Sequence, residues 1–287
     1  MAFQRVGILG CGLMGSGIAQ VCAHAGYATI VREVDEAALD RGLARIRSFL
    51  DEGVAKGKVA ADARDQAWAR LSGTTRVEEL AGCDLVVEAV VEDLEAKRQA
   101  YAALQPVLGP PALLASNTSS LSITELAAAS GRPGRFAGLH FFNPVPLMKL
   151  VEVVRGLETA DRTWRDLVAF ARSLGKEPVT APDRPGFIVN RLLFPYLLDA
   201  VRSHEAGLGT VEEIDAAMKL GCGHPMGPFA LLDFIGLDTA YSIATVMYEE
   251  FRDPAFAPPP LLKRLVLARR LGRKSGHGFY RYQDGPK

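Results

Sequence analysis

The sequence has few cysteines and no excess of charge of either sign. Scattered thiols fit a reducing compartment and exclude a disulfide framework. They show neither CxxC spacing nor histidine partners at zinc-site distances, so no metal is expected; the four are Cys11, Cys22, Cys83 and Cys222. Lys plus Arg total 33, as do Asp plus Glu, so no global charge directs the chain to nucleic acid or an anionic membrane. An anionic ligand must be held by local groups.

Long hydrophobic segments are also missing. No apolar run approaches the roughly 18 residues that a membrane span requires. The N-terminus leads directly into a strand-like segment, without a basic region followed by an apolar stretch, so no signal peptide is expected. We therefore expect a soluble, cytoplasmic protein with no membrane partner. A chain of 287 residues is too long for one comfortable core and suits two domains.

The first part of the chain alternates short apolar runs with longer helical patterns. The runs are rich in Val, Ile and Leu without clean alternation, which favours a parallel sheet covered on both faces. This βαβ rhythm predicts an α/β domain with a doubly wound sheet. Strands are expected over 6–9, 28–33, 85–91, 113–116, 136–140 and 148–154, and helices over 14–25, 36–55 and 162–174.

The pattern changes near residues 180–186, where two prolines and a glycine mark a junction. Beyond it the periodicity is helical, and no internal repeat is present. We expect a domain of residues 1–183, with a helical hairpin inserted near 36–70, and an all-helical domain of residues 184–287. The helices of the second domain are expected over 187–206, 211–220, 229–250 and from the proline run at 258–260 to about 271.

The glycine pattern Gly10-Cys-Gly12-Leu-Met-Gly15 follows the first expected strand and opens a helix. The glycine pattern alone is weak evidence for a nucleotide site, since glycines are common in turns that bind no ligand. Its position in a βαβ unit, however, is the one that dinucleotide binding needs. Gly10 makes the tight turn, Gly12 lets the backbone approach a pyrophosphate, and Gly15 allows close packing of helix on strand. The N–H groups at the helix start, around Leu13 and Met14, face the anion. A Rossmann-type cofactor site is predicted.

The choice of cofactor depends on the end of the second strand. Glu33 lies 18 residues after Gly15, and an acidic side chain there accepts hydrogen bonds from ribose hydroxyls and repels a 2′-phosphate. This predicts NAD rather than NADP. Arg32 weakens the inference because an arginine can receive that phosphate, and Asp35 is a rival for the role of Glu33.

Polar residues follow the strand at 113–116. Small polar side chains at the carboxyl end of a parallel strand lie where ligands bind in open α/β sheets. Helix capping is the alternative explanation, but the segment from Ser122 to Glu125 already supplies a capping box. Ser119 is therefore predicted to contact a ligand.

A histidine and a glutamate occupy two later strands. His140 ends one strand beside aromatic residues, where a structural role is the commoner explanation. Strand alternation puts Glu152 on the apolar face shared by Met148, Leu150 and Val154. A buried carboxylate needs a partner, since an unpaired one costs several kcal/mol, and a histidine is a natural partner. The pair predicts a general base whose protonated form is stabilised by the carboxylate.

Asn190 presents the same problem on a helix. Its neighbours at helical spacing are apolar, so its amide needs a hydrogen-bond partner. A structural tie between domains and a functional contact remain equal alternatives on this argument alone.

Together these residues resemble the L-3-hydroxyacyl-CoA dehydrogenases, including 3-hydroxybutyryl-CoA dehydrogenases. The resemblance runs from Arg5 to about Tyr282 and depends on several long motifs in the same order. The motifs span residues 10–15, 116–120 (SNTSS), 138–146 (GLHFFNPVP), 185–191 (PGFIVNR), 224–228 (HPMGP) and 274–280 (KSGHGFY). Two departures are visible: Glu33 replaces the more usual aspartate, and Cys11 replaces a small alanine whose exchange we expect to be tolerated.

The resemblance implies an enzyme that oxidises 3-hydroxyacyl-CoA with NAD, with His140 and Glu152 as the catalytic pair. It implies that Ser119 and Asn190 bind the reacting oxygen, and that Lys56, in the hairpin, meets the CoA phosphates. It also implies a homodimer formed through the helical domain. Further cofactor contacts are implied for Glu92, Lys97, Asn143 and Lys274.

Two other functions remain open. A dehydrogenase of a free hydroxyacid or sugar acid can share this layout. One such group has a catalytic lysine four residues before the interdomain asparagine, where this chain has Gly186. A non-catalytic dinucleotide-binding protein is the second alternative, and the intact set of candidate catalytic residues argues against it.

Overall fold

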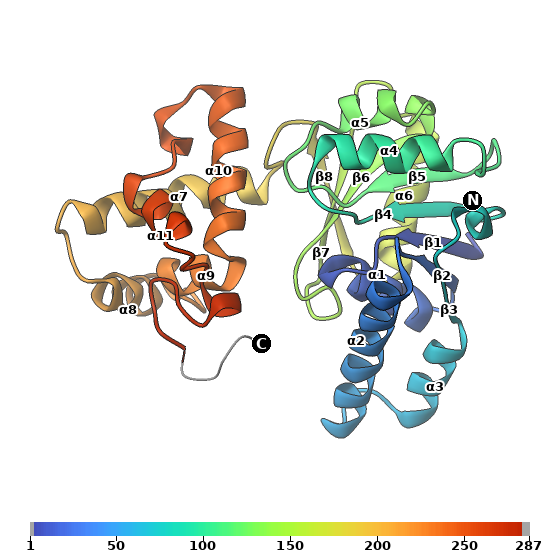
Figure 1. The fold of residues 1–287 in the computed structure, drawn as a ribbon, viewed down its shortest axis with the longest axis horizontal. Helices are drawn as coiled ribbons and strands as arrows, with labels where there is room; N and C mark the ends of the chain where they lie inside the picture. Colours follow the sequence, from blue (N-terminus) through green and yellow to red (C-terminus); the bar gives the residue numbers. More distant parts are fainter. Residues whose placement is uncertain (1–2, 283–287) are drawn as a thin grey trace. The chain divides into compact units, whose positions relative to one another are not determined.

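The computed structural model describes residues 3–282, and its chain divides into two compact units, Met1–Arg184 and Pro185–Lys287. Within the described residues the first unit holds an eight-stranded sheet of order β3-β2-β1-β4-β5-β6-β7-β8 (Figure 1). Strands β1 to β6 are parallel, β7 is antiparallel to β6, and β8 is parallel to β7. The bounds are β1 Arg5–Leu9, β2 Ala28–Arg32, β3 Leu71–Thr74, β4 Leu85–Glu88, β5 Leu113–Ser116, β6 Phe136–Phe141, β7 Leu150–Arg155 and β8 Glu177–Pro182.

Helices connect the parallel strands, so the predicted doubly wound α/β fold is confirmed. Strands β4, β5 and β6 are buried along their whole length, as their largely apolar sequences indicate. Each fully buried Val, Leu or Ile contributes about 1.5–3 kcal/mol. The helical elements of this unit are α1 Leu13–His24, α2 Glu36–Ala55, α3 Ala61–Ala69, η1 Val77–Leu80, α4 Leu94–Leu104, α5 Ile123–Ala129, η2 Pro133–Arg135 and α6 Asp161–Ser173.

The sheet differs from the sequence prediction in three places. The strand expected over 85–91 ends at Glu88, because the Glu88 carboxylate accepts a hydrogen bond from the N–H of Val90 at 2.9 Å and turns the chain. Strands β3 and β8 were not predicted. A glycine lies inside β3, and two prolines lie in the edge strand β8, so neither segment has a typical strand composition.

The hairpin of α2 and α3 extends from the sheet beside α1 (Figure 1). Helix α2 packs directly on the glycine loop: a Cβ at Gly42 would lie 2.2 Å from Sγ of Cys11. Because glycine has no side chain, position 42 leaves room for the side chain of Cys11, which is buried. Burial raises the pKa of the Cys11 thiol to about 12, with Glu33 acting in the same direction, so the thiol stays neutral.

The second unit is helical in its described part, as predicted. The segment expected as one helix over 229–250 is two helices, because the chain breaks at Gly236, where φ is +97°. The last long helix ends at Leu267 rather than near 271. The elements are α7 Val189–Glu205, α8 Val211–Cys222, α9 Pro228–Ile235, α10 Leu237–Phe251, η3 Pro254–Phe256, α11 Pro260–Leu267 and η4 Arg273–Ser275.

Two buried carboxylates organise this unit. Asp215 accepts hydrogen bonds from the N–H groups of Phe229 (2.8 Å) and Ala230 (3.0 Å) at the start of α9. Asp233 accepts them from the N–H groups of Phe279 and Tyr280, both at 2.9 Å. Buried carboxylates are tolerated only when hydrogen-bonded in this way. The motif at 274–280 is therefore anchored to α9 through Asp233.

Within residues 3–282, no single helix combines the length and the apolar composition of a membrane span. Helices α9 and α10 have that length and composition only when they are taken together, and the two helices meet at an angle of 96°. Over the same residues, no three or more His, Cys, Asp or Glu side chains form a group suited to hold a metal ion.

Candidate active site

The glycine loop between β1 and α1 has the geometry that a dinucleotide needs. Gly10 has φ of +99°, and a Cβ at Gly15 would lie 1.9 Å from the carbonyl oxygen of Gly10. A Cβ at Gly12 would meet nothing within 4 Å. Helix α1 has no side-chain cap at its N-terminus and no acidic residue in its first turn, so its N–H groups and dipole are available to an anion. The loop therefore fits a pyrophosphate.

Glu33 lies at the end of β2, against this loop. Its Oε1 accepts a hydrogen bond from the N–H of Cys11 at 2.6 Å, and its Oε2 accepts one from Val34 at 2.9 Å. A carboxylate has about four acceptor sites, so two remain for ribose hydroxyls. Asp35, by contrast, caps α2 by accepting from the N–H of Ala38 at 2.7 Å. This arrangement favours Glu33 over Asp35 as the ribose ligand.

His140 and Glu152 face each other across the antiparallel pair of β6 and β7, as register partners. Nδ1 of His140 lies 2.7 Å from Oε2 of Glu152, and their side chains are 8% and 0% exposed. The ring of His140 also packs against Phe142, with 4.5 Å between ring centroids. The pairing predicted from strand alternation is present, and a buried carboxylate beside Nδ1 fixes the orientation of the imidazole.

Two residues that sequence reasoning missed position this pair and the loop after it. The Asn117 side-chain oxygen accepts a hydrogen bond from the N–H of Phe141 at 2.9 Å, which joins the ends of β5 and β6 beside His140. The Lys176 ammonium donates to the carbonyls of Val145 (2.6 Å) and Met148 (2.8 Å). Burial lowers the pKa of Lys176. In both cases the hydrogen-bond partner is distant in sequence, so the local sequence does not indicate the contact.

Glu92 and Ser119 meet beyond the ends of β4 and β5. Oε1 of Glu92 accepts hydrogen bonds from the N–H (2.7 Å) and hydroxyl (3.2 Å) of Ser119 and from the hydroxyl of Thr118 (2.6 Å). Burial raises the pKa of Glu92, but the charge of Lys97 and these hydrogen bonds outweigh it and hold the pKa below its ordinary value. Glu92 therefore carries its charge at neutral pH. Ser122 caps α5, as predicted, by accepting from the N–H of Glu125.

The remaining candidates belong to several different elements. Leu13 and Asn143 line one cavity of about 40 Å³ between α1, α2 and the loop after β6. Lys56 is the C-cap residue that follows α2, and it is ion-paired with Glu52. Asn190 lies in the first turn of α7, in the second unit. Lys274, also in the second unit, pairs with Asp238 at 2.6 Å.

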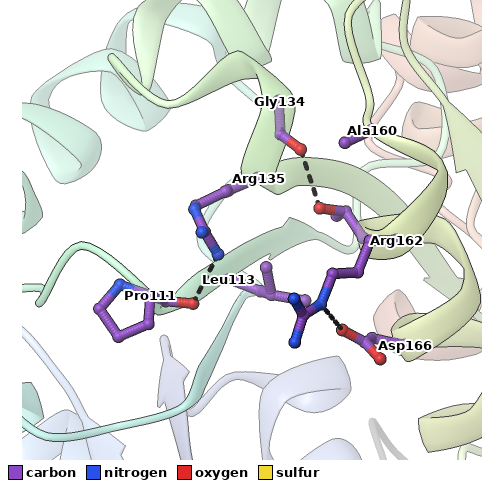
Figure 2. Close-up of a pocket in the computed structure, with 8 residues that line it drawn as sticks. Pro111, Leu113, Gly134, Arg135, Ala160, Arg162 and Asp166 are labelled. Atoms are coloured by element: carbon purple, nitrogen blue, oxygen red, sulfur yellow. Dashed lines mark hydrogen bonds and ion pairs between the residues drawn. The ribbon is translucent and has the colours of Figure 1, made fainter. Parts of the chain in front are cut away.

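A larger cavity, of about 250 Å³, is lined by none of these residues (Figure 2). Its lining comes from segments that precede β5 and β6 and from the start of α6, at the opposite edge of the sheet from the glycine loop. Arg135 donates to the carbonyl of Pro111 at 3.0 Å, and Thr163 donates to the carbonyl of Gly134 at 2.8 Å. These contacts join the segments that line the cavity, so we interpret the lining residues as structural.

The glycine loop, Glu33, Glu92, Ser119 and His140 all lie at or just beyond the carboxyl ends of their strands. Parallel strands bring these ends to one edge of the sheet, where ligands bind in open α/β folds. A dinucleotide loop and a buried His–Glu pair at one edge define the class of NAD(P)-dependent oxidoreductases.

Comparison with known proteins narrows this class. Residues 5–184 match the family model "3-hydroxyacyl-CoA dehydrogenase, NAD binding domain", and residues 186–282 match "3-hydroxyacyl-CoA dehydrogenase, C-terminal domain". The chain belongs to the 3-hydroxyacyl-CoA dehydrogenase family. It is thus a dehydrogenase whose cofactor is NAD, as the sequence predicts.

Individual relatives match over nearly their whole length. The chain is 50% identical to a 3-hydroxybutyryl-CoA dehydrogenase of Mycobacterium tuberculosis, covering 98% of this chain and 99% of the relative. It is 46% identical to the mitochondrial hydroxyacyl-coenzyme A dehydrogenase of Sus scrofa, over 98% and 91%. The crystal structure of (S)-3-hydroxybutyryl-CoA dehydrogenase PaaH1 from Ralstonia eutropha superimposes with a TM-score of 0.94 at 44% identity, over 99% and 100%.

Proposed function

We propose that the protein catalyses the reversible, NAD-dependent oxidation of short-chain L-3-hydroxyacyl-CoA, such as 3-hydroxybutyryl-CoA, to 3-oxoacyl-CoA. The observation that carries the proposal is the buried contact of 2.7 Å between Nδ1 of His140 and Oε2 of Glu152, at the sheet edge that also holds the glycine loop. The names of the relatives support the thioester substrate. Membership of the family supports NAD.

In this proposal His140 removes the proton of the 3-hydroxyl while C3 loses a hydride. NAD, bound on the glycine loop, supplies the hydride acceptor. Glu152 orients the imidazole and stabilises the imidazolium that forms. Ser119 binds the C3 oxygen as it becomes a carbonyl. Asn190 is proposed as a further contact of the substrate. In the reverse direction the protonated His140 acts as the acid.

The other candidate residues take supporting roles. Gly10, Gly12 and Gly15, with Leu13 and Met14, form the pyrophosphate loop. The remaining cofactor contacts are those of Glu33, Glu92, Lys97, Asn143 and Lys274, and Lys56 meets the CoA phosphates. We propose a domain division between residues 183 and 184, one residue before the boundary of the two compact units. We also propose a homodimer formed through the helical domain and a cytoplasmic location.

The experiment that tests the reaction follows NADH absorbance with purified protein and acetoacetyl-CoA. Free acetoacetate and NADPH are the paired controls. Oxidation of NADH by the thioester alone supports the reaction, the need for CoA and the cofactor preference together. Activity on the free acid but not on the thioester assigns the protein to the hydroxyacid or sugar-acid dehydrogenases instead.

The Glu33→Ala variant tests the origin of cofactor choice. We expect it to lose discrimination between NADH and NADPH, because the carboxylate that repels a 2′-phosphate is removed. The ratio of kcat/KM for the two cofactors measures the effect. An Asp35→Asn variant is the control, since Asp35 caps α2 and an asparagine also caps helices. Unchanged discrimination in Glu33→Ala together with a loss in Asp35→Asn would transfer the role to Asp35.

A further inference from the structure

The carboxylate of Glu88, at the end of β4, is fully buried and fully hydrogen-bonded. It is 0% exposed. Its Oε1 accepts from the Lys97 ammonium at 2.6 Å and from the N–H of Val90 at 2.9 Å. Its Oε2 accepts from the hydroxyls of Ser116 (2.6 Å) and Tyr101 (2.7 Å). A buried charge is costly to retain, so a carboxylate held by four donors calls for an explanation beyond packing.

Lys97 connects this buried carboxylate to the site. Its ammonium lies 2.6 Å from Oε1 of Glu88 and 3.3 Å from Oε2 of Glu92. The Lys97 side chain is only 1% exposed, whereas that of Glu92 is 36% exposed. Lys97 therefore sets the position of Glu92, which is the more accessible of the two side chains.

Glu92 in turn holds the loop that carries Ser119. The same carboxylate that faces Lys97 through Oε2 accepts, through Oε1, the N–H of Ser119 at 2.7 Å and the N–H of Ser120 at 3.2 Å. A displacement of Glu92 would move the backbone and the hydroxyl of Ser119 with it. The contacts thus form one continuous series from Glu88 through Lys97 and Glu92 to Ser119.

The position of this series on the sheet indicates which half of the cofactor it serves. Dinucleotides bind across the point where strand order reverses, here between β1 and β4. Glu33, the ribose ligand of the adenine half, follows β2 on one side of that point. Glu92 and Ser119 follow β4 and β5 on the other side, so they belong to the nicotinamide half.

We propose that Glu88 is a positioning residue for the nicotinamide end of the site: through Lys97 it fixes Glu92 and Ser119 in the geometry that the reaction needs. Glu88 itself touches neither cofactor nor substrate. The proposal rests on the proposed function. It adds a residue that the sequence analysis did not single out.

The test compares Glu88→Gln with Tyr101→Phe, a matched control that removes a buried hydrogen bond to the same carboxylate but leaves the Lys97 contacts in place. NADH affinity is measured by fluorescence titration. The affinity for ADP-ribose, which lacks nicotinamide, is measured from its displacement of bound NADH. In Glu88→Gln we expect NADH affinity and kcat to fall about ten- to hundredfold, the range for a misplaced reacting group, with ADP-ribose affinity unchanged. Tyr101→Phe should leave both affinities unchanged.

A double-mutant cycle tests the route through Lys97. The variant Glu88→Gln/Lys97→Met removes both charges of the fully buried Glu88–Lys97 pair, so neither is left buried without the other even if a single variant folds poorly. Glu92 loses the charge of Lys97 in this variant just as it does in Lys97→Met alone. If Glu88 acts through Lys97, the double variant binds NADH as weakly as Lys97→Met alone. Multiplied losses, equal weakening of NADH and ADP-ribose, or equal effects of Glu88→Gln and Tyr101→Phe would overturn the proposal. The binding measurements need no substrate, so they decide it even if acetoacetyl-CoA proves not to be a substrate.

Discussion

Replacing His140 by alanine should lower kcat with acetoacetyl-CoA and NADH by about a hundred- to ten-thousandfold, the usual contribution of a positioned general acid or base. The imidazole is the group beside Glu152 proposed to exchange a proton with the C3 oxygen, and alanine has no atom that replaces it. NADH affinity should remain near that of the wild type, because the glycine loop and Glu33 belong to other strands of the sheet. Steady-state kinetics and a fluorescence titration measure the two quantities.

A His140→Asn variant is the control for packing. The amide of asparagine can still donate a hydrogen bond toward Oε2 of Glu152, which lies 2.7 Å from Nδ1 in the wild type. It has no basic nitrogen, so it should be as inactive as His140→Ala while keeping more of the thermal stability. Turnover of His140→Asn near the wild-type rate would show that His140 is not the base.

The His140–Glu152 contact was predictable because it joins two strands that follow each other directly in the chain. Strand alternation placed Glu152 on an apolar face, and the cost of burying a carboxylate required a partner. The structure places the two residues in register on neighbouring strands. The place of Ser119 after a parallel strand predicted a ligand contact, whereas the roles proposed for Ser119 and Asn190 at the reacting oxygen rest on the resemblance of the motifs.

The secondary structure was predictable where the apolar periodicity of a segment and its length indicate the same element. The prediction failed where local backbone geometry interrupts a periodic pattern that continues in the sequence. The apolar period runs on through Gly236, and only its positive φ separates α9 from α10. Strand β8 was missed because its prolines argue against a strand, although an edge strand tolerates them.

The contacts that complete the site were missed for a different reason. Glu88 meets Tyr101 and Ser116, 13 and 28 positions away, and Asn117 meets Phe141 24 positions away. Each partner lies on another strand or helix, so the pairing depends on the sheet order and not on spacing along the chain. Spacing along the sequence therefore did not identify these contacts.

The Gly12→Ala variant should separate cofactor binding from folding. A Cβ at Gly12 meets no protein atom within 4 Å, and the backbone there has φ of −66°, which alanine adopts without strain. The free protein should therefore keep its thermal stability. If the pyrophosphate approaches the backbone at this point, the added methyl group occupies its space, and NADH affinity should fall at least about tenfold, or ~1.4 kcal/mol.

Two further glycine variants serve as controls for Gly12→Ala. Gly15→Ala puts a Cβ 1.9 Å from the carbonyl oxygen of Gly10, so it should lose both stability and NADH affinity. Gly221→Ala, in α8, also places its Cβ in open space, and alanine favours a helix, so it should change neither binding nor activity. A Gly12→Ala variant that binds NADH as tightly as Gly221→Ala would show that the pyrophosphate does not approach Gly12. A loss of affinity without a loss of stability would place the anion at the N-terminus of α1, because the methyl group can then interfere with nothing but the ligand.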